Sequence, residues 1–269
     1  MIKKLIVIII FVILLLTSTY FIFFRKDSSK SVNSNISITP INTYVPSDNP
    51  SLTKTPNNQN NSDYQLNYII VRPTDIIELH SNLEDKLTST EARNKFGCTS
   101  LISGGFYGTS DEHLGLFVAQ SNLISKSINS TLLNGFFLID NSKTPTIVSK
   151  VSDNINDYRI AIQSGPLLLT NKIKTSTGYD DADYARRIIV AISNRGEITF
   201  LSLHTKNNPL LGPTLNDLPG IIESLGKTTS LNLVDAINLD GGSHSTFLTE
   251  SANLSELSTI GSFFCIKPR

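Results

Sequence analysis

The chain has 269 residues, and its 23 Lys and Arg balance its 23 Asp and Glu, so the formal net charge is zero. Beyond the first 26 residues the basic side chains form no cluster, and the positive footprint that nucleic-acid binding requires is missing. We therefore expect no nucleic-acid partner.

The first feature along the chain is residues 5–24, an apolar run without a charge that lies between two basic pairs. As a helix rising about 1.5 Å per residue, this run spans roughly 30 Å, the thickness of a bilayer core. We therefore predict that residues 1–26 are a transmembrane anchor, with a short tail inside and the rest of the chain extracytoplasmic. The alternative is a signal peptide cleaved near Tyr20, which would make the protein secreted.

Residues 27–63 are rich in Ser, Asn, Thr and Pro and show no apolar periodicity. Such a segment cannot bury a core, and it is typical of a solvated linker. As a random coil it has a root-mean-square reach of about 35 Å, which would hold the following domain close to the membrane. Residues 64–269 are numerous enough to form one domain with a substantial core.

Within this domain, short apolar runs alternate with turn residues, a pattern that indicates β-strands. The predicted strands span residues 66–71, 76–79, 99–102, 114–119, 136–139, 160–163, 188–192, 198–203, 236–239 and 263–266. Two helices are predicted, one over residues 88–96 that ends at Gly97 and one over residues 214–225. The pattern predicts an α+β fold, a single domain with a large mixed β-sheet core and few helices.

The two cysteines, Cys98 and Cys265, lie in no metal-ligand spacing. In an oxidising compartment they would form a disulfide, and the alternative is two separate buried thiols. The histidines His80, His113 and His204 make no ligand spacing with each other or with His244. We therefore expect no metal site and no cofactor.

Four segments place glycines and polar side chains at the ends of predicted strands, where the backbone can approach a ligand closely. They are residues 103–107, 161–168, 186–196 and 236–246. They contain the sequences Ser-Gly-Gly-Phe-Tyr, Gln-Ser-Gly-Pro, Arg-Arg-Ile-Ile-Val-Ala and Asn-Leu-Asp-Gly-Gly-Ser-His. Each alone is a common turn, but their order is informative.

In this order the segments resemble the phosphodiester glycosidase domain family over residues 66–267, and Gln-Ser-Gly-Pro and Leu-Asp-Gly-Gly are the most specific parts. The resemblance implies a hydrolase that removes a sugar from a phosphodiester-linked cell-envelope glycan, as an N-acetylglucosamine-1-phosphodiester-type glycosidase does. It also implies a glycan or sugar-phosphate substrate, and an exported or membrane-anchored protein like the exopolysaccharide-related bacterial members.

This reaction at an anomeric carbon has an oxocarbenium-like transition state that a carboxylate stabilises, and a phosphate leaving group requires positive charge. Asp240 is the predicted carboxylate, and its alternative role is to cap local amides in a turn. Arg187 is predicted to bind the phosphate, although the adjoining Arg186 leaves the register open by one residue. His244 is a candidate for proton transfer or, alternatively, a hydrogen-bonding surface residue.

The resemblance also implies a set of substrate-binding residues around the carboxylate. They are Ser103, Gly104, Gly105, Gln163, Ser164, Gly165, Gly241 and Gly242. Among them, the two side chains of Gln163 and Ser164 would hydrogen-bond sugar hydroxyls, and the amides of Gly104 and Gly105 would face an anion. The acidic residues Asp180, Asp181 and Asp183 are either the source of a second carboxylate or a solvated loop.

A second function is kept as an alternative, a non-catalytic glycan-binding or envelope-organising domain on the same fold. It is motivated by Ser103, which stands where the family has Asn, and by Ile188, which stands where the family has Thr or Asn. Ser is shorter than Asn and cannot present an amide donor and a carbonyl acceptor together.

Overall fold

The computed structural model describes residues 63–152, 154–176, 178 and 183–269, which all belong to one compact unit. The predicted anchor and all but the last residue of the predicted linker lie outside the described residues. Within the described part of the chain, no helix is long and apolar enough to cross a membrane.

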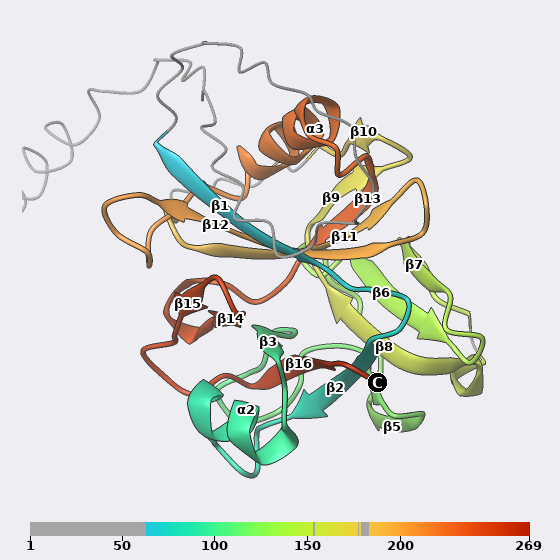
Figure 1. The fold of residues 1–269 in the computed structure, drawn as a ribbon. Coiled ribbons are helices and arrows are strands. Elements are labelled where there is room, and N and C mark those ends of the chain that lie inside the picture. Colours follow the sequence, from blue (N-terminus) through green and yellow to red (C-terminus); the bar gives the residue numbers. More distant parts are fainter. Residues whose placement is uncertain (1–62, 153, 177, 179–182) are drawn as a thin grey trace, which may run out of the picture. The chain divides into compact units, whose positions relative to one another are not determined.

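Strands dominate the described residues and form three sheets (Figure 1). The six-stranded sheet has the order β1-β12-β11-β13-β9-β10. Its strands are β1 (Tyr64–Ile70), β9 (Leu167–Thr170), β10 (Ile173–Lys174), β11 (Arg187–Ser193), β12 (Ile198–Thr205) and β13 (Leu233–Asn238).

The other two sheets have five strands each, in the orders β15-β14-β3-β16-β2 and β5-β4-β8-β6-β7. The first contains β2 (Ile76–Ser81), β3 (Ser100–Ser103), β14 (Phe247–Leu248), β15 (Asn253–Leu254) and β16 (Ser262–Lys267). The second contains β4 (Phe117–Ala119), β5 (Asn122–Ser125), β6 (Gly135–Asp140), β7 (Pro145–Val148) and β8 (Tyr158–Ser164).

Every pairing among these strands is antiparallel, so the prediction of one large mixed sheet is wrong. Many successive strands pair through short connections, as β11 and β12 do. A short connection permits only an antiparallel pair, because parallel strands need a crossover of about a dozen residues or more.

The described residues contain two α-helices, as the prediction of few helices requires, and two 3₁₀ turns, η1 (Ile155–Asp157) and η2 (Gly242–His244). Helix α2 (Ser89–Phe96) begins at a capping box, in which Thr88 and Glu91 exchange hydrogen bonds, and it ends at Gly97 in the left-handed conformation. Helix α3 (Leu218–Thr228) begins four residues later than predicted. Thr214 and Asp217 form a hydrogen-bonded turn before it, and a Pro stands in its first turn, where no backbone donor is needed.

The six-stranded sheet has α3 on one face and the two five-stranded sheets on the other (Figure 1). Its buried apolar residues belong to two separate cores. On one face, Ile189 and Ala191 of β11 pack against α3, whose buried residues recur at three and four positions. On the other face, Ile188 and Val190 pack with residues of both five-stranded sheets. Both faces of β11 are therefore buried, which fixes the position of the residues at its two ends.

Cys98 and Cys265 form a disulfide, which decides between the two alternatives that the sequence left open. The bond joins the residue after the cap of α2 to β16, across 167 positions of sequence. It lies in a small apolar core with Leu101 and Phe263. The disulfide therefore fastens α2 to the middle of its sheet.

Replacing both cysteines, as Cys98→Ser with Cys265→Ser, is expected to lower the free energy of unfolding by about 2–5 kcal/mol, because the unfolded chain gains the freedom of a long loop. Denaturant titration of the full-length chain measures the change. Reductant should shift the wild-type midpoint in the same direction and leave the double variant unchanged. Equal midpoints for oxidised wild type and the double variant would contradict the prediction.

Candidate active site

A pocket of about 470 Å³ opens where β11 begins and β13 ends. Polar side chains and glycines make up one part of its lining and apolar side chains the other. The polar part consists of Asp183, Arg187, Asn238, Asp240, Gly241, Gly242, Ser243 and His244. The remaining lining residues are Phe106, Leu132, Tyr184, Ala185, Leu210 and Leu215.

The register of two neighbouring strands brings the main candidates together. Ile189 of β11 pairs with Asn238 of β13, and the Leu239 N–H donates to the Ile188 carbonyl oxygen at 2.7 Å, so the antiparallel register continues toward Arg187 and Asp240. Directly opposed residues of antiparallel strands project from the same face. The sequence separates Arg187 and Asp240 widely, and the sheet places both on one pocket.

Asp240 is held by two backbone hydrogen bonds. Its N–H donates to the carbonyl oxygen of Gly104 at 3.0 Å, and the Gly241 N–H donates to its carboxylate Oδ1 at 2.9 Å. Burial raises the pKa of this half-buried carboxyl from 3.8 to about 7, against the smaller effect of the Gly241 bond. Asp240 can therefore exchange a proton near neutral pH.

This raised pKa predicts a pH dependence of stability. In the unfolded chain the carboxyl ionises near its ordinary pKa of 3.8, whereas the folded chain keeps the proton to about pH 7. Between these values a rise in pH favours the unfolded chain, so the free energy of unfolding should fall, by at most about 4 kcal/mol. Asp240→Asn should remove this decline.

Urea titration of wild type and Asp240→Asn from pH 4 to pH 8 tests this expectation. The difference between their free energies of unfolding should change through the interval and level off above it. Parallel stability profiles for the two proteins would mean that the carboxyl of Asp240 is not perturbed by burial.

Arg187 is buried and lies at the first position of β11. Its Nε donates to the carbonyl oxygen of Pro213 at 2.9 Å, and its Nη2 donates to the carbonyl oxygen of Asp183. An ion pair of 3.6 Å joins the same nitrogen to the exposed Asp183 carboxylate. The guanidinium is thus held in one orientation on the pocket wall, where an anion would meet it.

Arg186 has a different environment, although it is the next residue. It is 1% exposed, and its guanidinium donates to Ser245 Oγ at 2.9 Å and to several backbone carbonyl oxygens, including that of Ser255 at 3.0 Å. Burial lowers its pKa to about 10, which still leaves it charged at neutral pH. Arg186 therefore holds the loop after β13 in place and does not line the pocket.

His244 is exposed at the pocket rim, and its Nδ1 lies 3.1 Å from Ser243 Oγ. Its ring meets that of Tyr107 edge-on, with centroids 6.1 Å apart. The pKa of Tyr107 is raised by burial and, to a lesser degree, by the charge of Asp240. His244 is placed to contact a ligand in the pocket, and its role in proton transfer stays a prediction.

The two glycines after Asp240 determine the shape of the loop, and their backbone N–H groups donate hydrogen bonds within the protein. A Cβ on Gly241 would lie 2.5 Å from the carbonyl oxygen of Arg186, so no side chain fits there. Gly242 has a φ of +65°, and its N–H donates to the same oxygen at 2.8 Å. Both line the pocket, and their small size keeps it open.

The other predicted ligands do not line this pocket. They are Ser103, Gly104, Gly105, Gln163, Ser164 and Gly165. Gln163 shows why: its amide Nε2 donates to the carbonyl oxygens of Ile128 and Leu133, both at 2.8 Å, and its Oε1 accepts from the N–H groups of Leu116 and Ile128. The Gln163 side chain therefore connects three segments of the chain by hydrogen bonds, and none of its polar atoms faces a sugar in this structure.

Ser103 and the two glycines after it are likewise engaged within the fold. Ser103 Oγ accepts from the Thr246 N–H at 2.5 Å, and Gly104 and Gly105 donate their N–H groups to Ser262, at 2.9 and 3.0 Å. The expectation that these glycines offer amides to an anion therefore does not fit this structure. Gly104 contributes through its carbonyl oxygen, which accepts the N–H of Asp240.

The Gln-Ser-Gly-Pro segment holds the backbone of Asn238, a residue that lines the pocket. Ser164 Oγ donates to the carbonyl oxygen of Asn238 at 2.7 Å, and the Gly165 N–H donates to the same oxygen at 3.1 Å. The Gly165–Pro166 peptide bond is cis. A Cβ on Gly165 would lie 2.0 Å from the carbonyl oxygen of Leu132, so only glycine allows this close approach.

Of the acidic stretch, Asp180 and Asp181 lie outside the described residues, whereas Asp183 lines the pocket and pairs with Arg187. Asn238 also lines the pocket, although the sequence pattern gave this residue no predicted role. The signal was available, because residues two apart on a strand share a face and Asn238 precedes Asp240 by two positions.

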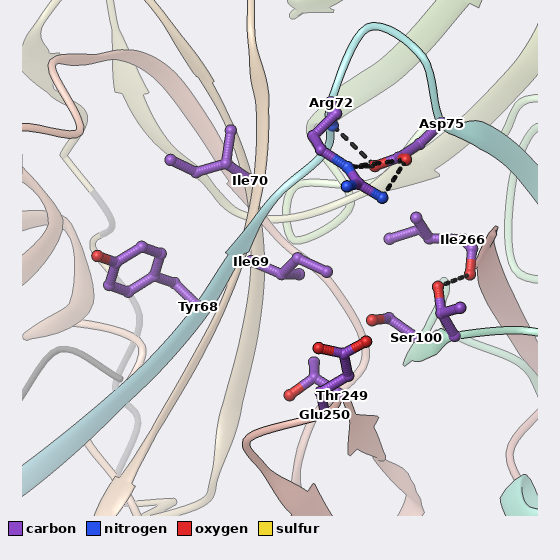
Figure 2. A pocket seen from close by; sticks show the side chains of 10 residues that line it. Tyr68, Ile69, Ile70, Arg72, Asp75, Ser100, Thr249, Glu250 and Ile266 are labelled. Atoms are coloured by element: carbon purple, nitrogen blue, oxygen red, sulfur yellow. Dashed lines mark hydrogen bonds and ion pairs between the residues drawn. The ribbon is translucent and has the colours of Figure 1, made fainter. Parts of the chain in front are cut away.

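A separate small pocket of about 100 Å³ lies between β1 and the sheet that contains β16 (Figure 2). Of its three charged residues, Arg72 and Asp75 form an ion pair of 2.9 Å with each other, and the third is Glu250. No predicted site residue lines it. Among the residues that the structure describes, no three His, Cys, Asp or Glu side chains are grouped to hold a metal ion.

The geometry defines a sheet-rich domain with a carboxyl and an arginine that face one pocket from adjacent strands, a candidate active site for an anionic substrate. The phosphodiester glycosidase family model matches residues 96–262, and the chain therefore belongs to this family. The resemblance read from the order of the four segments is confirmed.

The fold is similar to the catalytic domain of zebrafish N-acetylglucosamine-1-phosphodiester alpha-N-acetylglucosaminidase, auto-inhibited by its pro-peptide, with a TM-score of 0.56 at 16% identity over 79% of this chain and 86% of that one. A hypothetical protein from Synechocystis gives a TM-score of 0.56 at 13% identity, over 77% and 59% of the two chains. No curated protein matches the chain. At these identities the solved structures show a shared fold.

Proposed function

We propose that the chain is a membrane-anchored, extracytoplasmic hydrolase that cleaves a sugar from a phosphodiester-linked cell-envelope glycan, as an N-acetylglucosamine-1-phosphodiester-type glycosidase. The observation that carries the proposal is the placement of Asp240 and Arg187 on one pocket, from neighbouring strands. Membership of the phosphodiester glycosidase family supports it.

In the proposed reaction, the bond between the anomeric carbon and the phosphate oxygen breaks, and the bonding pair leaves with the phosphate. Water supplies the hydroxyl group of the released sugar. The ionised carboxylate of Asp240 stabilises the oxocarbenium-like transition state, either as nucleophile or as the base for water. Arg187 binds the phosphate and compensates the charge that develops on it.

The departures from the family pattern have a limited effect on this proposal. The Ile188 side chain packs in the core on the face of β11 opposite the pocket, and Ser103 is buried against Thr246. Neither residue contributes to the pocket lining. They therefore give little support to the alternative of a non-catalytic glycan-binding domain.

Two features support the extracytoplasmic placement. Residues 5–24 have the length and apolarity of a membrane span. The disulfide between Cys98 and Cys265 is typical of chains that fold in an oxidising compartment.

The test is the release of free sugar by the full-length chain from uridine-diphosphate-N-acetylglucosamine and from alkyl phosphodiesters of N-acetylglucosamine and other sugars. We expect release from at least one donor, with the phosphate product formed in equal amount, which is uridine diphosphate from the nucleotide sugar and the alkyl phosphate monoester from an alkyl phosphodiester. No release above the Asp240→Asn background from any donor would overturn the hydrolase proposal. Binding of these donors without turnover would favour the glycan-binding alternative.

A further inference from the structure

Asn238, the last residue of β13, has an unusual unmet hydrogen-bonding capacity. The residue is 1% exposed, and among the described residues its side-chain oxygen Oδ1 has no hydrogen-bond partner. Buried polar atoms almost always have partners, because an unpaired acceptor gives up its water without compensation. Asn238 is also one of the residues that line the Asp240 pocket.

The orientation of this amide is fixed by its neighbours. Its Nδ2 donates to the carbonyl oxygen of Gly165 at 2.9 Å, and the reversed amide would set two acceptors against each other. The backbone of Asn238 is held equally firmly, since its N–H donates to Pro166 and its carbonyl oxygen accepts from Ser164 and Gly165. Oδ1 is therefore the side-chain atom of Asn238 that has no partner among the described residues.

The chemistry of Oδ1 limits what that ligand can be. An amide oxygen only accepts hydrogen bonds, and the oxygens of an ionised phosphodiester also only accept. Among the groups of a sugar-phosphate ligand, the partner must therefore be a hydroxyl or an amide N–H of the sugar. Arg187 has the opposite preference, because a guanidinium only donates. The pocket therefore has a hydrogen-bond acceptor on β13, Asn238 Oδ1, and hydrogen-bond donors on β11, the guanidinium of Arg187.

We propose that Asn238 Oδ1 accepts a hydrogen bond from one hydroxyl or amide N–H of the sugar, and that this bond orients the sugar phosphate with its phosphate toward Arg187. The inference rests on the proposed function for the class of ligand. Asn238 is thus a specificity-determining residue. A site built to pair a substrate hydroxyl or N–H discriminates strongly against the analogue that lacks it, because the buried acceptor is left unpaired.

Calorimetric binding to the full-length chain tests the proposal. The ligands are N-acetylglucosamine 1-phosphate, its 3-, 4- and 6-deoxy forms, and 2-deoxyglucose 1-phosphate, which has no donor at that carbon. We expect wild type to bind one analogue roughly 10- to 100-fold more weakly than the parent. Asn238→Leu, which keeps the size of the side chain, should weaken parent binding and abolish the discrimination at that one position.

A matched control is Asn67→Leu, the same change at a buried asparagine of the same sheet. Asn67 pairs with His204 and does not line the pocket, so this variant should keep the wild-type discrimination. Uniform affinity of wild type for all analogues would overturn the proposal, and so would an undiminished penalty in Asn238→Leu. If Asn238→Leu does not fold, the wild-type series decides alone.

Sugar release measured in parallel separates this inference from the proposed function. Selective binding without release would defeat the hydrolase proposal and leave the role of Asn238 intact. Release without selectivity at any position would defeat the role of Asn238 alone. If neither binding nor release is observed, both proposals are overturned.

Discussion

Asp240→Asn is expected to lower kcat/KM for sugar release by about 10³-fold, because an amide can neither attack the anomeric carbon nor accept a proton from water. The exchange preserves the size of the side chain and an oxygen that can accept the Gly241 N–H, so the loop after β13 should keep its conformation. Release of free sugar under conditions where substrate is well below KM gives the ratio directly.

The matched control for this experiment is Asp235→Asn, the same exchange on β13, the strand that precedes Asp240. Asp235 accepts the Asn171 N–H at 2.9 Å, lies outside the pocket lining and should leave kcat/KM within about twofold. In wild type, kcat/KM should rise with pH and level off above about 7, where Asp240 is ionised. Retention of more than a tenth of wild-type activity by Asp240→Asn would remove Asp240 from the mechanism.

Arg187→Ala is expected to lower kcat/KM by about 10²- to 10³-fold. A loss of this size is usual when one group that stabilises developing charge in a water-excluded site is removed. Arg187→Lys should recover only part of this loss, because an ammonium keeps the charge without the planar fork that binds two phosphate oxygens. Steady-state rates with one phosphodiester donor, compared with far-ultraviolet circular dichroism and thermal midpoints, separate loss of chemistry from loss of fold.

Two other arginines serve as controls for Arg187. Arg195, on the turn at the far end of β11, is exposed and pairs with Glu197, so Arg195→Ala should change the rate by less than about twofold. Arg186→Lys should instead reduce the free energy of unfolding by at least about 2 kcal/mol, because it breaks several charge-assisted hydrogen bonds. Near-normal activity of Arg187→Ala would mean that a residue other than Arg187 binds the phosphate.

The elements that the sequence predicts well are those with complete local signals. Helix α2 has its capping box and its terminal glycine within ten residues, and the long apolar strands have runs that stand out from their turns. Strands of two residues, such as β10, β14 and β15, are too short to show any period. The division into three sheets depends on pairings between distant segments, such as β1 with β12, that no local pattern contains.

The same distinction separates the site residues. Asp240 and Arg187 carry charges at strand ends, and the sequence alone pointed to them. The side chain of Gln163 has equally suitable chemistry for a sugar, but its partners lie 30 and 35 positions away and only the fold reveals that they occupy it. Asn238 is the converse case, because its unpaired oxygen becomes evident only once every neighbouring donor is accounted for.

The place of β16 in its sheet has a consequence for how the chain folds. This strand ends at Lys267, yet it lies between β2 and β3 and pairs with both. The sheet therefore cannot form before residues 262–267 are available, and its closing contacts span most of the domain. Pairings of such long sequence separation fold slowly. The domain should acquire its native structure only after β16 has been synthesised, and the link from Cys98 to Cys265 can close only after that step.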